Sequence, residues 1–144
     1  MRTPPGGFSG DARQEAKDSR YPVDVSWESL AGAQPMLMRI AVKSVNRIVI
    51  VQVGDIVRIE AEDNYVRLWA ERPYLHKETL SGLVARLSPL DFLRVHRSHA
   101  INVQCVRELR PKLHGEYLIV LSDGTEVTSG RGFRAPIQSM FGLA

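Results

Sequence analysis

His96, Arg97, Ser98 and His99 stand together in the C-terminal half of this 144-residue chain and carry groups that could do chemistry. A histidine beside a serine could serve nucleophilic catalysis, and paired histidines could bind a metal ion. Residues three apart lie on opposite faces of a strand, however, and few carboxylates stand nearby to complete a metal site. The single cysteine, Cys105, also excludes a multi-cysteine zinc site. Neither chemistry is favoured.

The sequence also lacks the common enzyme signatures. It contains no phosphate loop, no Gly-x-Gly-x-x-Gly, no Gly-x-Ser-x-Gly and no His-Glu-x-x-His. We therefore expect a protein that is not an enzyme, that has no metal site and that needs no cofactor.

Contact with nucleic acid suits the same residue types better. The planar guanidinium of Arg97 can bond O6 and N7 of a guanine together. His96 can donate to a phosphate or a base, and Ser98 can donate to a phosphate or cap a turn. The alternative for His96 is structural, since an imidazole can fix a bend by bonding a neighbouring backbone carbonyl.

Basic charge is concentrated in the same part of the chain. Residues 1–72 contain ten Lys or Arg and ten Asp or Glu, whereas residues 73–144 contain nine and six, so the net charge of +3 lies in the second half. Between Arg94 and His114 only Glu108 opposes the basic residues, which are Arg94, Arg97, Arg107, Arg110 and Lys112. Such a patch can neutralise phosphates and release their counterions, although a charge excess alone is also typical of a solvated face.

The elements that must position these residues are mostly short strands. From Met36 onward, apolar or alternating runs are separated by turn residues, which is typical of a mainly β domain. The predicted strands cover residues 36–42, 47–52, 56–61, 65–70, 74–77, 92–95, 100–103, 106–111, 117–121 and 126–128. Apolar residues at helical spacing predict a helix over residues 79–87, which Thr79 or Ser81 can cap. A short closing helix is predicted over residues 133–141, with Pro136 in or near its first turn.

Residues 1–35 have a different composition. The first twenty are rich in Gly, Pro and charged residues without periodicity, and the weak pattern over residues 21–35 fits a short arm. We expect residues 1–35 to form a flexible lead-in or arm and residues 36–144 to form the folded domain. The start has no secretory signal, and no apolar run approaches the roughly 18 residues of a membrane helix, so a cytoplasmic protein is expected.

The stretch Phe92-Leu-Arg-Val-His-Arg-Ser-His-Ala-Ile-Asn102 resembles the central signature of the LytTR family of bacterial DNA-binding domains. Further resemblance lies in Ile56-Val-Arg-Ile-Glu60, Asn64-Tyr65-Val66, His76-Lys77-Glu78-Thr79-Leu80 and the segment 123–131, which ends in Ser-x-Arg. His99 and Ala100 are mild departures from the usual pattern. The resemblance covers about three quarters of the chain.

The resemblance implies stacked small antiparallel β-sheets with one short helix, and loops that enter successive major grooves in place of a recognition helix. It implies base contacts by Arg97 and Arg131, and next by His96. Backbone or supporting contacts are implied for Asn64, Arg67, Arg94, Ser98 and Arg134. Arg94 has the alternative of a structural ion pair, and Asn102 is expected to bond backbone groups at a bend.

The expected function is sequence-specific binding of double-stranded promoter DNA by a transcription regulator, with a homodimer on paired half-sites as one arrangement. Regulators of the family usually carry a receiver domain or a sensor, which residues 1–35 cannot form, so a separate signalling protein is a possible partner. One alternative is a standalone adaptor or inhibitory module that binds a partner regulator. Another is a single-stranded nucleic-acid binder, for which Tyr65, Trp69, Tyr74 and Tyr117 would have to form a contiguous stacking surface.

Overall fold

A computed structural model describes residues 36–143, which lie in the compact unit Met36–Ala144. The lead-in or arm expected for residues 1–35 lies outside the described residues. Within the described part, no helix is long and apolar enough to cross a membrane.

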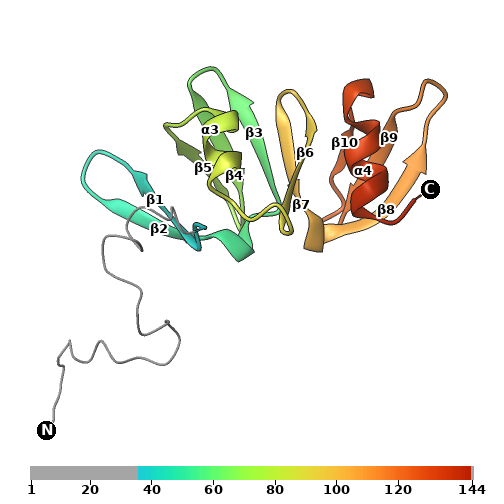
Figure 1. Cartoon of the computed structure of the whole chain (residues 1–144). Coiled ribbons are helices and arrows are strands. Elements are labelled where there is room, and N and C mark those ends of the chain that lie inside the picture. Colours follow the sequence, from blue (N-terminus) through green and yellow to red (C-terminus); the bar gives the residue numbers. More distant parts are fainter. Residues whose placement is uncertain (1–35, 144) are drawn as a thin grey trace, which may run out of the picture. The chain divides into compact units, whose positions relative to one another are not determined.

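Three small antiparallel sheets make up this domain (Figure 1). The first contains β1 (Arg39–Lys43) and β2 (Ile48–Gln52). The second has the strand order β5-β4-β3-β7-β6 and contains β3 (Arg58–Glu62), β4 (Tyr65–Trp69), β5 (Pro73–His76), β6 (Phe92–His96) and β7 (His99–Asn102). The third has the order β10-β9-β8 and contains β8 (Val106–Pro111), β9 (Tyr117–Leu121) and β10 (Glu126–Thr128).

Short helices connect or cover the sheets. They are the α-helices α3 (Leu80–Ala85) and α4 (Arg134–Met140), and the 3₁₀ helices η1 (Val53–Asp55), η2 (Val103–Cys105) and η3 (Arg131–Phe133). The structure thus confirms the predicted fold class, a mainly β stack of small antiparallel sheets with one short helix and a C-terminal helical turn.

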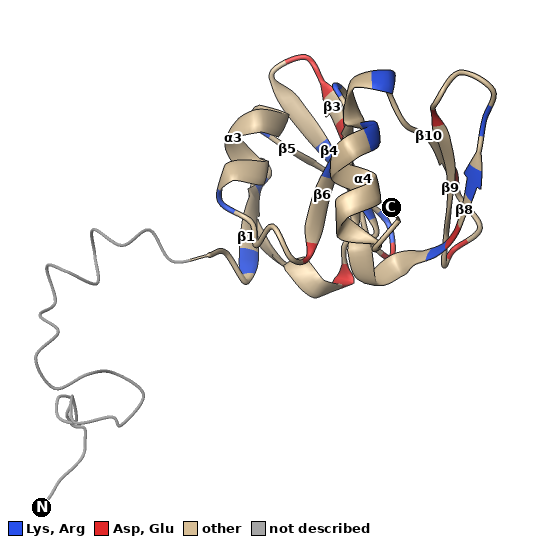
Figure 2. Cartoon of the chain, turned by 45° about the vertical axis from the view of Figure 1, so that its right-hand side comes forward, with Lys and Arg blue, Asp and Glu red and all other residues tan. Residues whose placement is uncertain are grey.

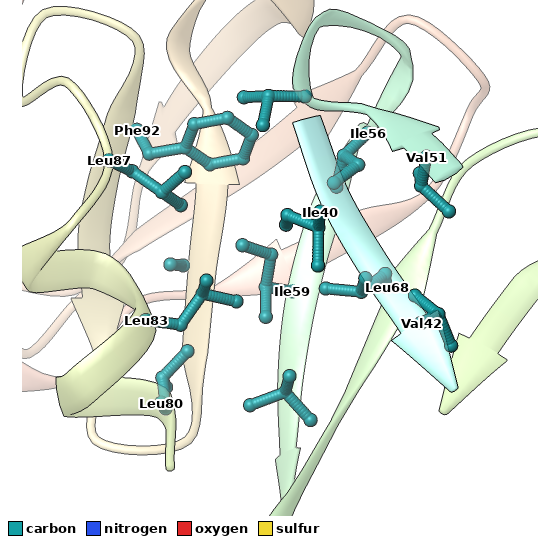
Figure 3. Packing of buried hydrophobic residues seen from close by; sticks show 13 residues of the cluster. Ile40, Val42, Val51, Ile56, Ile59, Leu68, Leu80, Leu83, Leu87 and Phe92 are labelled. Carbon is teal, nitrogen blue, oxygen red and sulfur yellow. The ribbon is translucent and has the colours of Figure 1, made fainter. Parts of the chain in front are cut away.

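Two hydrophobic cores hold the sheets together. In the first core, one face of the five-stranded sheet packs against α3 and against β1 and β2 (Figure 3). Ile59 of β3 and Leu68 of β4 are fully buried there, with Leu83 of α3 on one side and Ile40 of β1 on the other. These side chains follow the alternation of a strand, since every second residue of β3 and β4 faces this core.

The second core lies on the opposite face of β6 and β7. Val95 and Ile101 pack there against Ile119 of β9 and Ile137 of α4, all fully buried. Neighbouring residues of β7 therefore face different cores, because Ala100 belongs to the first core. The β6–β7 hairpin is consequently packed on both faces, which makes it a rigid support for the turn at its end.

Local capping interactions occur at the predicted positions. The hydroxyl oxygen of Thr79 accepts a hydrogen bond from the Gly82 amide at 3.1 Å and caps α3. The side chain of Asn102, which is 4% exposed, donates to the Ile56 carbonyl at 2.8 Å and accepts from the Gln104 amide at 2.9 Å. The expected role of Asn102 in bonding backbone groups at a bend is therefore confirmed.

The direction of the strands brings several turns to one edge of the domain. Both β3 and β6 run antiparallel to β7, so the β3–β4 turn and the β6–β7 turn lie at the same end of the five-stranded sheet. The start of α4 and the β8–β9 turn lie along this edge as well, which is the upper edge in Figure 1.

Candidate functional site

A bulge in β6 gives the predicted signature its geometry. The register of β6 and β7 shifts between Arg94 and His96, so that Val95 is an extra residue of β6. A bulge bends its strand and re-aims the side chains that follow it. Arg94 accordingly contacts α3, whereas the ring of His96 lies against Gly130, the residue before η3.

The backbone of the β6–β7 turn is held by side chains. The guanidinium of Arg94 donates through Nε to the His96 carbonyl at 3.0 Å, through one terminal nitrogen to the Arg97 carbonyl, and through the other to the Ser81 hydroxyl at 3.2 Å. The described residues include no carboxylate within salt-bridge distance of this guanidinium. Arg94 thus bonds carbonyl and hydroxyl oxygens in the place of the ion pair that was one of its expected roles.

His96, Ser98 and His99 form a hydrogen-bonded chain beneath the turn. Nδ1 of His96 accepts from the Ser98 amide at 3.1 Å, so this nitrogen carries no proton and Nε2 carries it instead. The Ser98 hydroxyl lies 2.9 Å from Nδ1 of His96 and 3.1 Å from Nδ1 of His99. The arrangement is satisfied when His99 donates to Ser98 and Ser98 donates to His96, which leaves Nε2–H of His96 as a donor.

Charged residues of β3 surround His99. Burial lowers the pKa of His99 below its ordinary value, and repulsion from Arg58, and from His96 when that ring is protonated, lowers it too, while the Glu60 carboxylate 3.6 Å away opposes them. Glu60 also accepts from the indole N–H of Trp69 at 3.2 Å, and the guanidinium of Arg58 lies 4.4 Å from the centre of the Trp69 ring. Burial thus favours the neutral form of His99, in which Nδ1–H still donates to Ser98.

Arg97 and Arg131 are both exposed on the same edge of the domain. Arg97 occupies the tip of the β6–β7 turn, and Arg131 is the first residue of η3. The Gly130 amide donates to the Val95 carbonyl at 2.9 Å, which fixes the start of η3 beside the end of β6. The two residues expected to contact bases are thus presented by neighbouring elements.

The β3–β4 turn carries Asn64, which is exposed, and Asp63, whose φ of 57° places it in the left-handed region. Arg67 of β4 bonds the Glu62 carboxylate with two nitrogens, at 2.7 and 2.8 Å, and lies 5.9 Å from the centre of the Trp69 ring. Its charge is therefore engaged within the hairpin. Acidic residues colour this turn red in Figure 2, so the turn is unsuited to close contact with phosphates.

Arg134 begins α4 and is exposed, with its guanidinium 5.6 Å from the centre of the Tyr117 ring. A Cβ atom on Gly115 would lie 3.3 Å from the same guanidinium, so Arg134 lies beside the β8–β9 turn. Lys112 and His114 of that turn are exposed.

The structure thus adds residues that sequence reasoning did not assign to the site. Lys112 and His114 belonged to the predicted basic run, and the antiparallel order of β8 and β9 was the signal that could have brought them to this edge. Ser81 and Glu60 gave no such signal, because their partners depend on the packing of α3 and on the pairing of β3 with β7. In the described part of the chain, no three His, Cys, Asp or Glu side chains converge as a metal site would require.

Comparisons with known proteins agree with this geometry. The family model of the LytTr DNA-binding domain matches residues 46–142. The chain is 26% identical over 125 residues to the sensory transduction protein LytT of Bacillus subtilis (strain 168), covering 86% of this chain and 50% of LytT. It is 32% identical over 110 residues to the heme-containing CO-sensing transcriptional regulator RcoM 1 of Paraburkholderia xenovorans (strain LB400), covering 74% of this chain and 41% of that protein. The chain thus spans half or less of the length of these two relatives.

A solved structure supports the same assignment of the fold. The structure of a LytTr DNA-binding domain from Bacillus cereus matches with a TM-score of 0.67 and 22% sequence identity. The match covers 74% of this chain and 98% of that domain, so the stacked-sheet architecture is shared over nearly all of the known domain.

Proposed function

Because the chain belongs to the family of LytTr DNA-binding domains, we propose that it binds double-stranded DNA in a sequence-specific manner and regulates bacterial transcription. In this proposal the turns on one edge of the domain enter the major grooves. The observation that carries it is the presentation of two exposed arginines, Arg97 and Arg131, from elements that are fixed side by side.

The chemistry of the edge favours base contacts by these two arginines. An exposed guanidinium on a fixed backbone can donate two parallel hydrogen bonds to O6 and N7 of a guanine. His96 offers its Nε2–H close to Arg97 and is suited to a phosphate or a base acceptor. Ser98 is bonded to both histidines, so we assign it a supporting role.

Two further residues on this edge are suited to the DNA backbone. Arg134 at the start of α4 and Lys112 in the β8–β9 turn are exposed cations at the same edge, and the start of α4 is blue in Figure 2. Asn64 can reach a base or sugar from the β3–β4 turn. Arg67 would first have to leave Glu62, so we expect its contribution to be small.

The size and composition of helix α3 support the proposal that loops contact the bases. Helix α3 has six residues and directs Leu80 and Leu83 into the first core. Its charged neighbours Glu78 and Arg86 bond each other at 2.9 Å. Such a helix presents no basic face to a groove, in contrast to the recognition helix of a helix-turn-helix protein.

The wider role is proposed from the relatives. LytT and RcoM 1 are named as a sensory transduction protein and a transcriptional regulator, respectively. We propose that the present chain likewise transmits a signal to a promoter, by way of a separate sensor or signalling protein. Two copies on paired half-sites, with bending of the DNA, would extend the contact area.

The described aromatic residues do not favour a single-stranded nucleic-acid binder. Tyr117 is 5% exposed, and Tyr74 packs against the first core. Arg58 lies over the Trp69 ring. Stacking of successive bases needs open aromatic faces, of which Tyr65, at 39% exposed, offers the largest.

The proposal is tested by selecting bound duplexes from a random DNA pool at near-physiological salt. The parent chain, Arg97→Ala and Arg131→Ala are compared. We expect the parent to enrich a repeated motif, and each variant to lose about 1–3 kcal/mol at that site and to relax the preference for one base. An equal loss on all sequences would contradict a base contact. No enrichment by the parent would favour the adaptor alternative.

A further inference from the structure

We infer that Arg94 is a positioning residue, which fixes the β6–β7 turn so that Arg97 points at the DNA, and that Arg94 does not itself contact DNA. The inference rests on the proposed function of Arg97. It replaces the DNA contact that the sequence signature implies for Arg94.

Three of the five N–H groups of the Arg94 guanidinium donate to oxygens inside the protein. All three of its nitrogens donate: Nε to the His96 carbonyl at 3.0 Å, and the terminal nitrogens to the Arg97 carbonyl and to the Ser81 hydroxyl at 3.2 Å. These donors lie in one rigid plane, so binding two successive carbonyls restricts the backbone between them. A phosphate could be bound without breaking this arrangement only through the two remaining N–H groups of the terminal nitrogens, so a bidentate contact through Nε would require giving up the bond to His96.

Both backbone polar groups of Ser98, the next residue of the turn, are also bonded. The Ser98 carbonyl accepts from the Ala61 amide at 2.8 Å, and the Ser98 amide donates to Nδ1 of His96 at 3.1 Å. The backbone is therefore fixed on both sides of Arg97, while the side chain of Arg97 is exposed. Fixing a contact residue before binding lowers the entropy that binding must otherwise remove.

The hydrogen bond from Arg94 to Ser81 connects the turn to a helix that packs on the first core. Ser81 lies on α3 between Leu80 and Leu83, which are 4% and 0% exposed. Helix α3 in turn packs against β3, β6 and β7. Arg94 thus connects the exposed turn to a helix that packs on the first core. The bulge at Val95 lets the side chains of Arg94 and His96 point to different elements.

The first arm of the test uses the full chain without DNA. Amide hydrogen exchange is compared for the parent, Arg94→Met and Arg94→Lys, with Arg107→Met as the matched control. Arg107 also donates to a backbone carbonyl, that of Ser122 at 2.7 Å, but away from the β6–β7 turn. We expect the Ser98 amide to exchange at least about tenfold faster in Arg94→Met, which corresponds to an opening that costs about 1.4 kcal/mol less. The control should leave that amide unchanged.

The second arm measures affinity for the duplex that the parent selects and for one with the Arg97 base changed. Arg94→Met should bind the selected duplex at least about tenfold more weakly than the parent does. It should also discriminate less between the selected and the changed duplex, because the backbone no longer holds Arg97 in the orientation that a base contact needs. Its salt slope should stay within about half a unit of the parent, whereas loss of a phosphate contact lowers the slope by about one. In an Arg97→Ala background, Arg94→Met should have little further effect.

Each other outcome overturns the inference. If Arg94→Met leaves the exchange rate of the Ser98 amide and the ratio of the two duplex affinities unchanged, the turn does not need the Arg94 hydrogen bonds. If the salt slope of Arg94→Met is lower by about one, Arg94 contacts a phosphate. If Arg94→Met does not fold, Arg94→Lys decides, since one ammonium cannot replace the planar guanidinium and full discrimination by it would refute the role. If the parent itself selects no duplex, the proposed function fails. The hydrogen-exchange experiment, which uses no DNA, still tests whether Arg94 fixes the turn.

Discussion

Asn102 links the five-stranded sheet to the three-stranded sheet, and we predict that its replacement destabilises the domain strongly. It ends β7, donates to the Ile56 carbonyl ahead of β3 at 2.8 Å, and caps η2, which leads into β8, at 2.9 Å. In Asn102→Ala the buried Ile56 carbonyl loses a partner, which costs about 1–3 kcal/mol, and η2 loses its cap, which costs about 1 kcal/mol. The sum is about 3 kcal/mol, so Tm should fall by roughly 12–24 °C for a domain of this size.

Urea and thermal unfolding followed by circular dichroism measure this change. Asn102→Asp separates the two bonds, because a carboxylate still accepts from Gln104 but donates to Ile56 only when protonated, so its stability should improve relative to Asn102→Ala as the pH falls. Asn46→Ala, in the exposed β1–β2 turn, is the control and should change stability by less than about 0.5 kcal/mol. A loss below about 1 kcal/mol in Asn102→Ala would refute the assigned role of the two hydrogen bonds.

Two further predictions concern charges at the edge of the domain that we propose to bind DNA. Since the pKa of folded His99 lies below the ordinary value of 6.5, the unfolded chain binds its proton more tightly, and the His99 contribution to stability is complete above pH 6.5 and is lost as the pH falls toward the folded pKa. As the pH is lowered from 7 into the acid range, the free energy of unfolding should therefore fall less in His99→Gln than in the parent. Denaturation of both proteins at several pH values measures this difference. Asp63→Asn keeps a residue type that tolerates the φ of 57° and removes a negative charge from the proposed interface, so binding to every duplex should tighten at low salt. Equal affinity of parent and Asp63→Asn in a fluorescence titration would place the β3–β4 turn away from the phosphates.

The elements of the fold were predictable because their signals are local. Turn residues and alternation predict β8, β9 and β10 with the bounds that the structure has, and Thr79 caps α3 as its position suggests. Strand ends elsewhere shift by one to three residues, as for β1, which begins at Arg39 where the apolar run begins at Met36. The 3₁₀ helices η1, η2 and η3 were not predicted, because three residues carry no periodicity.

The sequence names residues for the proposed interface, but it does not give their geometry. The signature indicates Arg97 and Arg131, but their closeness depends on the hydrogen bond from the Gly130 amide to the Val95 carbonyl, which fixes η3 beside the end of β6. Sequence spacing cannot reveal the bulge at Val95, which depends on how β6 meets β7. For the same reason Arg94 and Arg67 look like free cations in the sequence, although packing turns one toward backbone carbonyls and the other toward Glu62.

The central claim, that this edge reads a DNA sequence, is tested most directly by the ratio of two affinities. The full chain is titrated with the duplex that it selects and with a shuffled duplex of equal length, at near-physiological salt. The account predicts that the selected duplex binds about a thousandfold more tightly or better. Equal, strongly salt-dependent affinities for the two duplexes would contradict it and would leave only non-specific electrostatic binding.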